Sequence, residues 1–296
     1  MKNKIVIFII AGLFFLLGTQ SPARTVTDQL GRNLTVSDDP QRVVSLAPSI
    51  TEIIFALGQE HRLKGVTQFS DYPPQAAELP KVGSYIHPDL ERILALRPDL
   101  CIAVKDGNPK EAAQRLESLK IPVYAIDPKN LEEVAQTVLN IGGLLNADAE
   151  ASVAAENMRS RIQHIKSLVS KAETGQGVFF QIGISPIVSV GTDTFIHELI
   201  GLAGGKNLAA GPVPYPRFSR EQILALAPDV IIVTSMTRGG MFEQIKAEWQ
   251  RWPDIPAVRN NRIFIVDSNL FDRPTPRLAD GLEVLAKLLH PKLFDK

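Results

Sequence analysis

The stretch DAEASVAAENMRSRIQHIKSLVSK, residues 148–171, decides the fold because it is long and contains neither proline nor glycine. Its apolar residues recur at three- and four-residue spacing with charged residues between them, which predicts an amphipathic helix. At 1.5 Å per residue the helix would be roughly 35 Å long. We expect Asp148 to cap its first turn and Lys171 to lie at its end, where the helix dipole favours a cation. The apolar positions are Val153, Met158, Ile162, Ile165, Leu168 and Val169.

Two similar segments flank this helix. LERILALRPDLCIAV (90–104) precedes it and REQILALAPDVIIVT (220–234) follows it, and more than half of their aligned positions are identical. In each copy a short helix is expected to end at a Pro-Asp pair, and the apolar run that follows is typical of a buried parallel strand. The repeat favours two similar lobes joined by the long helix over one domain with that helix in its core.

Strands and helices alternate on both sides of the long helix, which predicts an α/β fold with a parallel-rich sheet in each lobe. A length of 296 residues is sufficient for two modest domains. We expect a signal peptide at 1–23, an N-terminal lobe at 24–147, a bridging helix at 148–172 and a C-terminal lobe at 173–296. Within the lobes we expect a hairpin around 30–32, strands at 43–46, 65–67, 123–126 and 263–266, and helices at 108–119, 131–145 and 276–289.

The N-terminus has the pattern of a secretory signal peptide. MKNK supplies positive charge, residues 5–17 are apolar, and Ser21-Pro22-Ala23 resembles a cleavage site with small residues. The apolar run is shorter than the ~20 residues that a membrane-spanning helix needs. We therefore expect export to the periplasm with cleavage after Ala23. Because no cysteine lies near that site, we expect no lipid anchor and a freely diffusing protein.

Composition excludes several function classes. Lysine plus arginine equals aspartate plus glutamate at 32 each, so no overall field attracts nucleic acid or an anionic membrane. The single cysteine, Cys101, lies in an apolar run and is expected to be a buried structural thiol. The five histidines are scattered singly, which predicts no metal site. His197, in a helix opposite the other lobe, is the one histidine for which a functional role is kept as an alternative to a structural one. No GxGxxG, GxxxxGK[ST], GxSxG or HExxH motif occurs, so we expect no enzyme.

Loops at the carboxyl ends of parallel strands are the expected place for a ligand. Three tyrosines lie in loops rich in proline and glycine: Tyr72 in SDYPP, Tyr85 in GSYIH and Tyr215 in VPYPR. A tyrosine side chain suits contact with a large planar ligand, because it is amphipathic and has few rotatable bonds. The alternative is that these rings only cover the rims of their own lobes, and this alternative is strongest for Tyr72.

These segments resemble a known family. The stretches RVVSLAPSITEIIFALG, GVTQFSDYPPQA, LERILALRPDL, VPYPRFSREQILALAPD, IPAVRNNRIFIVD and FDRPTPRLADGLEVLAKLLHP are similar to the substrate-binding proteins of bacterial ABC importers that bind cobalamin, iron-siderophores or haem, and most of all to the cobalamin branch. The resemblance implies two Rossmann-like lobes bridged by a rigid helix, with the ligand between them. It also implies that Glu91 and Glu221 dock on arginines of the two membrane subunits. We expect a monomer without a cofactor.

The implied ligand is cobalamin or a related corrinoid. The predicted ligand-binding residues are Pro48, Ser49, Tyr72, Tyr85, Tyr215, Asn269, Phe271 and Arg273. The chain departs from the cobalamin branch in several places, since Tyr85 and Tyr215 replace frequent tryptophans, Val104 and Ile182 replace aromatics, and Asn269 replaces an aspartate. The pocket wall should therefore be less aromatic. Haem is the alternative ligand because haem-binding relatives place an iron-ligating tyrosine close to position 85, and an iron-siderophore is the next.

Overall fold

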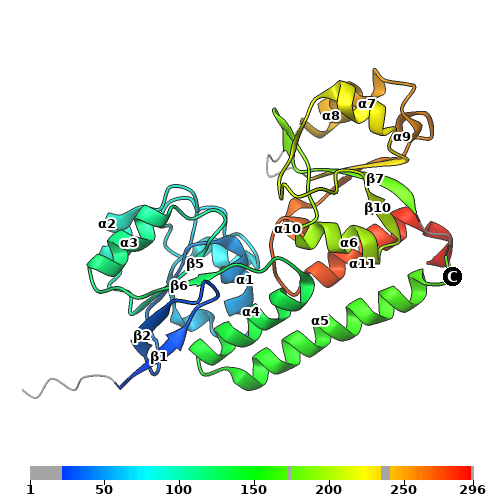
Figure 1. Ribbon diagram of the computed structural model, residues 1–296. Helices are drawn as coiled ribbons and strands as arrows, with labels where there is room; N and C mark the ends of the chain where they lie inside the picture. Colours follow the sequence, from blue (N-terminus) through cyan, green and yellow to red (C-terminus); the bar gives the residue numbers. More distant parts are fainter. Residues whose placement is uncertain (1–21, 173–174, 235–240, 295–296) are drawn as a thin grey trace, which may run out of the picture.

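The computed structural model describes residues 22–172, 175–234 and 241–294. They form two α/β lobes connected by one long helix (Figure 1). The predicted signal peptide lies almost wholly outside these ranges and stays a prediction. In the described ranges, no helix is both long and apolar enough to cross a membrane.

The first lobe contains a four-stranded parallel sheet with the strand order β4-β3-β5-β6. An antiparallel hairpin of β1 and β2 lies beside it, as expected from the turn around Gly31. The strands are β1 (Ala23–Thr27), β2 (Asn33–Ser37), β3 (Val43–Ser45), β4 (Leu63–Gly65), β5 (Leu100–Val104) and β6 (Val123–Ile126). The helices are α1 (Pro48–Ala56), η1 (Glu60–Arg62), η2 (Pro74–Glu78), α2 (Leu90–Ala95), α3 (Lys110–Ser118) and α4 (Leu131–Leu144).

The second lobe repeats this plan with a parallel sheet in the order β10-β7-β12-β13. A small antiparallel sheet, β11-β9-β8, follows the end of β7. The strands are β7 (Gln176–Gln181), β8 (Gly183–Ile184), β9 (Ile187–Val188), β10 (Gly205–Asn207), β11 (Arg217–Phe218), β12 (Val230–Thr234) and β13 (Ile263–Val266). The helices are α6 (Phe195–Leu202), α7 (Arg220–Leu226), α8 (Met241–Gln250), α9 (Pro256–Arg259), α10 (Ser268–Phe271), α11 (Leu278–Leu289) and η3 (Pro291–Leu293).

The internal sequence repeat is also a structural repeat. Both copies form a short helix followed by an interior strand, α2–β5 in one lobe and α7–β12 in the other. Each helix ends at a residue with left-handed backbone, Arg97 at φ 47° and Ala227 at φ 46°. The aspartate after the proline then accepts a backbone hydrogen bond from the strand segment beside it: Asp99 from the N–H of Arg42 at 2.9 Å, and Asp229 from that of Gly177 at 2.7 Å. The Pro-Asp pair thus ties each helix–strand unit to its sheet.

The bridging helix α5 (Asp148–Val169) confirms the prediction made for 148–171, with two corrections. Asp148 does not cap it, because Ala147 occupies the N-cap position and Asp148 begins the first turn. Val153 is 72% exposed and lies outside the buried stripe. The stripe begins instead with two alanines and consists of Ala151, Ala155, Met158, Ile165 and Val169.

The stripe of α5 is shared by the cores of both lobes. Ala151 packs in the core of the first lobe, together with the sheet and the second half of α4. Ala155, Met158, Ile165 and Val169 pack in the core of the second lobe with α6 and α11. Small side chains are needed where α5 meets α4: a Cβ atom on Gly142 of α4 would lie 2.3 Å from the Cβ of Ala151. The helix α5 therefore contributes to both cores, as does α4, which places Leu131, Val134 and Ala135 in the second core.

This close approach gives a matched test with two adjacent glycines of α4. Gly142→Ala should destabilise the protein by ~1–3 kcal/mol, because the new methyl group overlaps Ala151 and forces the helices apart. Gly143→Ala should stabilise it by ~0.5–1 kcal/mol, since alanine favours a helix over glycine and the nearest atom to its Cβ is a side-chain oxygen of Asp148 at 3.5 Å. Urea unfolding of both variants measures the difference. Similar midpoints would show that α4 and α5 are not tightly packed.

Candidate ligand-binding cleft

A cleft of about 380 Å³ lies between the two lobes. On one side it is lined by the loops after β3, β5 and β6, at the carboxyl ends of parallel strands, where α/β proteins hold their ligands. On the other side it is lined by the start of α6, by the loop that carries Tyr215, and by α10 with the turn after it. Its volume lies within the range of about 300–1,000 Å³ typical of small-molecule sites.

Most of the predicted ligand-binding residues meet in this cleft. The set comprises Pro48, Ser49, Tyr85, Tyr215, Asn269 and Arg273. Val104 and Ile182, the aliphatic residues at positions where aromatics were expected, line it as well. The structure thus brings together loops that are more than 200 residues apart in the sequence.

Two predicted residues lie elsewhere. Phe271 is fully buried, with its ring 5.6 Å from that of Phe180 in the second core. Because α10 is a single turn, Asn269 and Asp272 line the cleft while Phe271 is directed into the core. The ring centroid of Tyr72 lies 3.6 Å from the guanidinium carbon of Arg277, and Tyr72 lines a separate hollow. Neither Phe271 nor Tyr72 lines the cleft between the lobes, and Tyr72 contacts the second lobe through Arg277 instead of only covering the rim of its own lobe.

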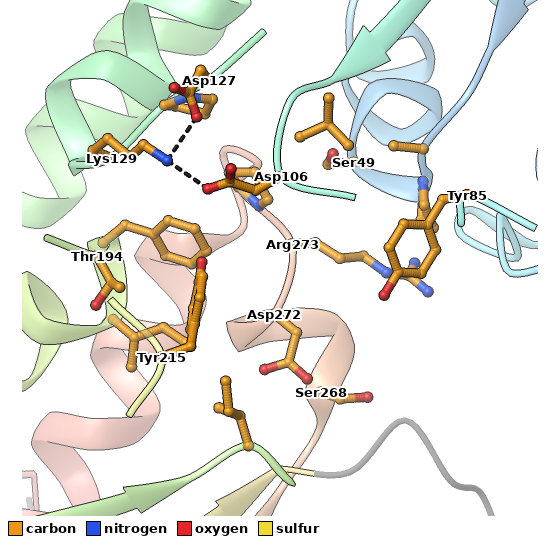
Figure 2. A pocket seen from close by; sticks show the side chains of 18 of the residues that line it. Ser49, Tyr85, Asp106, Asp127, Lys129, Thr194, Tyr215, Ser268, Asp272 and Arg273 are labelled. Atoms are coloured by element: carbon orange, nitrogen blue, oxygen red, sulfur yellow. Dashed lines mark hydrogen bonds and ion pairs between the residues drawn. The ribbon is translucent and has the colours of Figure 1, made fainter. Parts of the chain in front are cut away.

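Tyr85 and Tyr215 occupy opposite sides of the cleft, one from each lobe (Figure 2). The side-chain amide of Asn108 holds the Tyr85 loop by donating to the Tyr85 carbonyl at 2.7 Å. The Tyr85 ring packs on Gly107, where a Cβ atom would lie 2.7 Å from the ring. The Tyr215 loop is held by the segment that follows β9, where the Gly191 N–H donates to the Pro214 carbonyl at 2.7 Å. Hydrogen bonds to the backbone therefore hold both tyrosine-bearing loops.

Arg273 joins the lobes. Its guanidinium donates to Glu52 on α1 at 2.6 Å, to Asp71 at 3.1 Å and to the carbonyl of Phe69 at 3.0 Å. Arg277 approaches the other oxygen of Glu52 at 3.3 Å. Burial raises the pKa of Glu52, and the two arginines oppose that rise. Arg273 was predicted to meet a ligand's polar rim; in the structure it lines the cleft while paired with two carboxylates.

A second charged group was not predicted. Lys129 lies 2.6 Å from Asp106 and 2.7 Å from Asp127 (Figure 2). Lys105 lies 2.7 Å from the other oxygen of Asp127. Asp106 follows β5, and Asp127 and Lys129 follow β6. Their position directly after two predicted strands was the available sequence signal, since the carboxyl ends of neighbouring parallel strands meet at one edge of a sheet.

Asp272 is a further charged residue of the cleft that the sequence reasoning missed. It lines the cleft from the second lobe and accepts a hydrogen bond from the Thr234 hydroxyl at 3.1 Å (Figure 2). Burial raises the pKa of Asp272 to about 7, against the opposing effects of Thr234 and Arg273. The only sequence signal for Asp272 was its position, about one helical turn after the predicted residue Asn269.

The remaining predictions concern docking and metal binding. Glu91 and Glu221 are both exposed in the first turns of α2 and α7, at the outer ends of the two lobes (Figure 1). His197 lies with Nδ1 at 3.1 Å from the amide of Asn207, which is a structural contact. Cys101 is buried, as predicted, and burial raises its pKa to about 12. Over the described ranges, no cluster of three or more histidine, cysteine or acidic side chains is arranged to hold a metal ion.

The raised pKa of Asp272 predicts a pH-dependent effect on stability. An unfolded aspartate loses its proton at a pKa of about 3.9, whereas folded Asp272 keeps it until about pH 7. As the pH rises from about 4 to about 7, this group therefore lowers the free energy of unfolding by a growing amount. Above pH 7 the loss of stability stays at its full value. Asp272→Asn should raise the melting temperature by a few degrees at pH 8 and leave it nearly unchanged at pH 4. Equal shifts at both pH values in thermal denaturation would contradict the raised pKa.

Comparison with known proteins agrees with this architecture. The periplasmic binding protein family matches residues 43–270. The vitamin B12-binding protein of Vibrio parahaemolyticus is 34% identical over 254 residues, covering 84% of this chain and 90% of that protein. The crystal structure of the periplasmic vitamin B12 binding protein BtuF of Vibrio cholerae superposes with a TM-score of 0.74 at 32% identity, over 87% of this chain and 99% of that one. A periplasmic haem-binding protein from Pseudomonas aeruginosa superposes with a TM-score of 0.78 at 28% identity, over 85% and 93%. The chain belongs to the periplasmic binding protein family.

Proposed function

We propose that this protein captures cobalamin or a related corrinoid between its two lobes and delivers it to an ABC importer in the membrane. The observation that carries the proposal is the cleft itself, in which Tyr85 and Tyr215 lie on opposite sides. A large ring system can pack between aromatic and aliphatic walls, here provided by the tyrosines with Val104 and Ile182. The similarity to vitamin B12-binding proteins over most of the chain supports the same ligand.

Haem is the second candidate. Tyr85 directs its hydroxyl toward the interior of the cleft (Figure 2), where a phenolate could bind iron. The superposition on a haem-binding protein supports this alternative. Cobalamin needs no bond between the protein and its metal, so the two ligands make different demands on Tyr85.

The location and assembly of the protein follow from the same proposal. The signal-peptide pattern at 1–23 would direct the chain to the periplasm, with cleavage after Ala23. We infer a monomer without a lipid anchor that acts by binding and release and catalyses no reaction. Its partners would be the membrane subunits of the importer, with no nucleic acid among them.

The role of Tyr85 separates the two ligands. If cobalamin is the ligand, Tyr85→Phe should weaken its binding by no more than a factor of a few, because the ring contact remains. Tyr85→Ala should weaken it by about tenfold or more, since the ring's buried apolar area is lost. Titration of the purified protein with cyanocobalamin and with haem, followed by absorption, measures both. Loss of all binding in Tyr85→Phe, together with a tyrosinate-ligated haem spectrum of the wild type, would establish haem instead.

The paired glutamates predict a transport defect without a binding defect. Glu91→Ala combined with Glu221→Ala should abolish stimulation of transport by the binding protein and leave ligand affinity unchanged, because both side chains lie at the lobe ends and outside the cleft. The matched control is Glu111→Ala with Glu150→Ala, which removes two other exposed first-turn glutamates, from α3 and α5. Uptake into vesicles containing the importer measures the effect. Normal uptake with the first pair, or equal loss with both pairs, would exclude the docking role.

A further inference from the structure

We propose that the charges of the cleft select a ligand whose rim carries amides and reject one whose rim carries carboxylates. This inference rests on the proposed function and specifies which corrinoids the site accepts. The observation behind it is the pairing of the charged side chains that line the cleft. This pairing is independent of the two tyrosines that face each other across the cleft.

Both cations in the described lining of the cleft are already paired with two carboxylates. Lys129 is held between Asp106 at 2.6 Å and Asp127 at 2.7 Å. Arg273 is held between Glu52 at 2.6 Å and Asp71 at 3.1 Å. A carboxylate on a ligand would have to compete with these short contacts to reach either cation. Neither residue is therefore arranged to receive an anionic rim.

The acidic groups outnumber the cations in the same lining. Asp106 and Asp127 lie at one end of the cleft, and Asp272 lies toward the other (Figure 2). Asp193 adds a further carboxylate at the start of α6, where it is exposed. Near Asp106 and Asp127 a ligand carboxylate would meet carboxylates that already hold Lys129 and Lys105. From the second lobe it would face Asp272, which is ionised above its pKa of about 7, and a like charge nearby in a partly enclosed site is unfavourable.

Amide groups suit these surroundings. A primary amide carries two N–H donors and one carbonyl acceptor, so it can donate to Asp106 or Asp272 without adding charge. Hydrogen bonds from a neutral donor to a carboxylate are stronger than those between neutral groups. The rim of cobalamin carries such amides, whereas the propionates of haem and the carboxylates of hydrolysed corrinoids are anionic at neutral pH.

The test compares cyanocobalamin with its monocarboxylate derivative, in which one peripheral amide has been hydrolysed to an acid. Both carry the same ring system, so they differ only in the charge and hydrogen bonding of one rim group. Wild-type protein at pH 8 and low salt should bind cyanocobalamin about tenfold or more tightly than the acid, a ratio that one charged contact in a partly buried site can produce. Calorimetry or absorption titration gives both dissociation constants.

Asp106→Asn should reduce this ratio several-fold, because it removes one carboxylate and leaves Lys129 with a single partner that Lys105 also contacts. The control is Glu132→Gln, which removes the same charge from an exposed residue paired with Arg159, outside the cleft. That variant should keep the wild-type ratio.

Three results would overturn the proposal. Equal affinity of the wild type for cyanocobalamin and its acid would show that the cleft does not discriminate by charge, even though corrinoid binding itself stands. An unchanged ratio in Asp106→Asn would show that the paired lysine plays no part. Binding of haem without binding of cyanocobalamin would refute both this proposal and the proposed function, and is distinguished from the other results by the absent corrinoid signal.

Discussion

The burial of one helix stripe in two cores is the constraint on which the rest of the structure depends. Ala151 of α5 belongs to the core of the first lobe, and Met158, Ile165 and Val169 belong to that of the second. Protein interiors are close-packed and transmit small displacements. A shift of α5 against either lobe would therefore disturb both cores. The position of one lobe relative to the other, and with it the shape of the cleft, follows from side-chain packing along this helix.

The ion-pair group around Glu52 adds a second connection between the lobes. Glu52 is 4% exposed and lies in the first lobe, while Arg273 and Arg277 come from the second. A buried ion pair gives little net stability, because both charges lose water, but removal of one partner leaves the other uncompensated. The group therefore contributes more to the relative orientation of the lobes than to the free energy of unfolding. It also explains why Arg273 lines the cleft and yet is occupied.

The cleft combines two kinds of recognition. Tyr85, Tyr215, Val104 and Ile182 provide flat aromatic and aliphatic walls, which would contact the face of a ring system without regard to its charge. The paired charges around Lys129 line the same cleft. In the proposed complex the walls would contact a large planar ligand, and the charges would select the groups at its edge. Haem and cobalamin resemble one another in the first property and differ in the second.

The sequence by itself determined the α/β lobes and the bridging helix, and six of its eight predicted ligand-binding residues line the cleft. Helix and strand periodicity, the Pro-Asp stops and the repeated segment are local signals, and the expected bounds of the strands and helices are met to within three residues. Only the tertiary structure decided which side chains face each other. Phe271 is buried in the core, Val153 faces solvent, and Arg273 pairs with Glu52, which is more than 200 residues away in the sequence. The physical reason is that orientation within a short helix, and pairing between distant charges, depend on packing between elements, which no local pattern of residues contains.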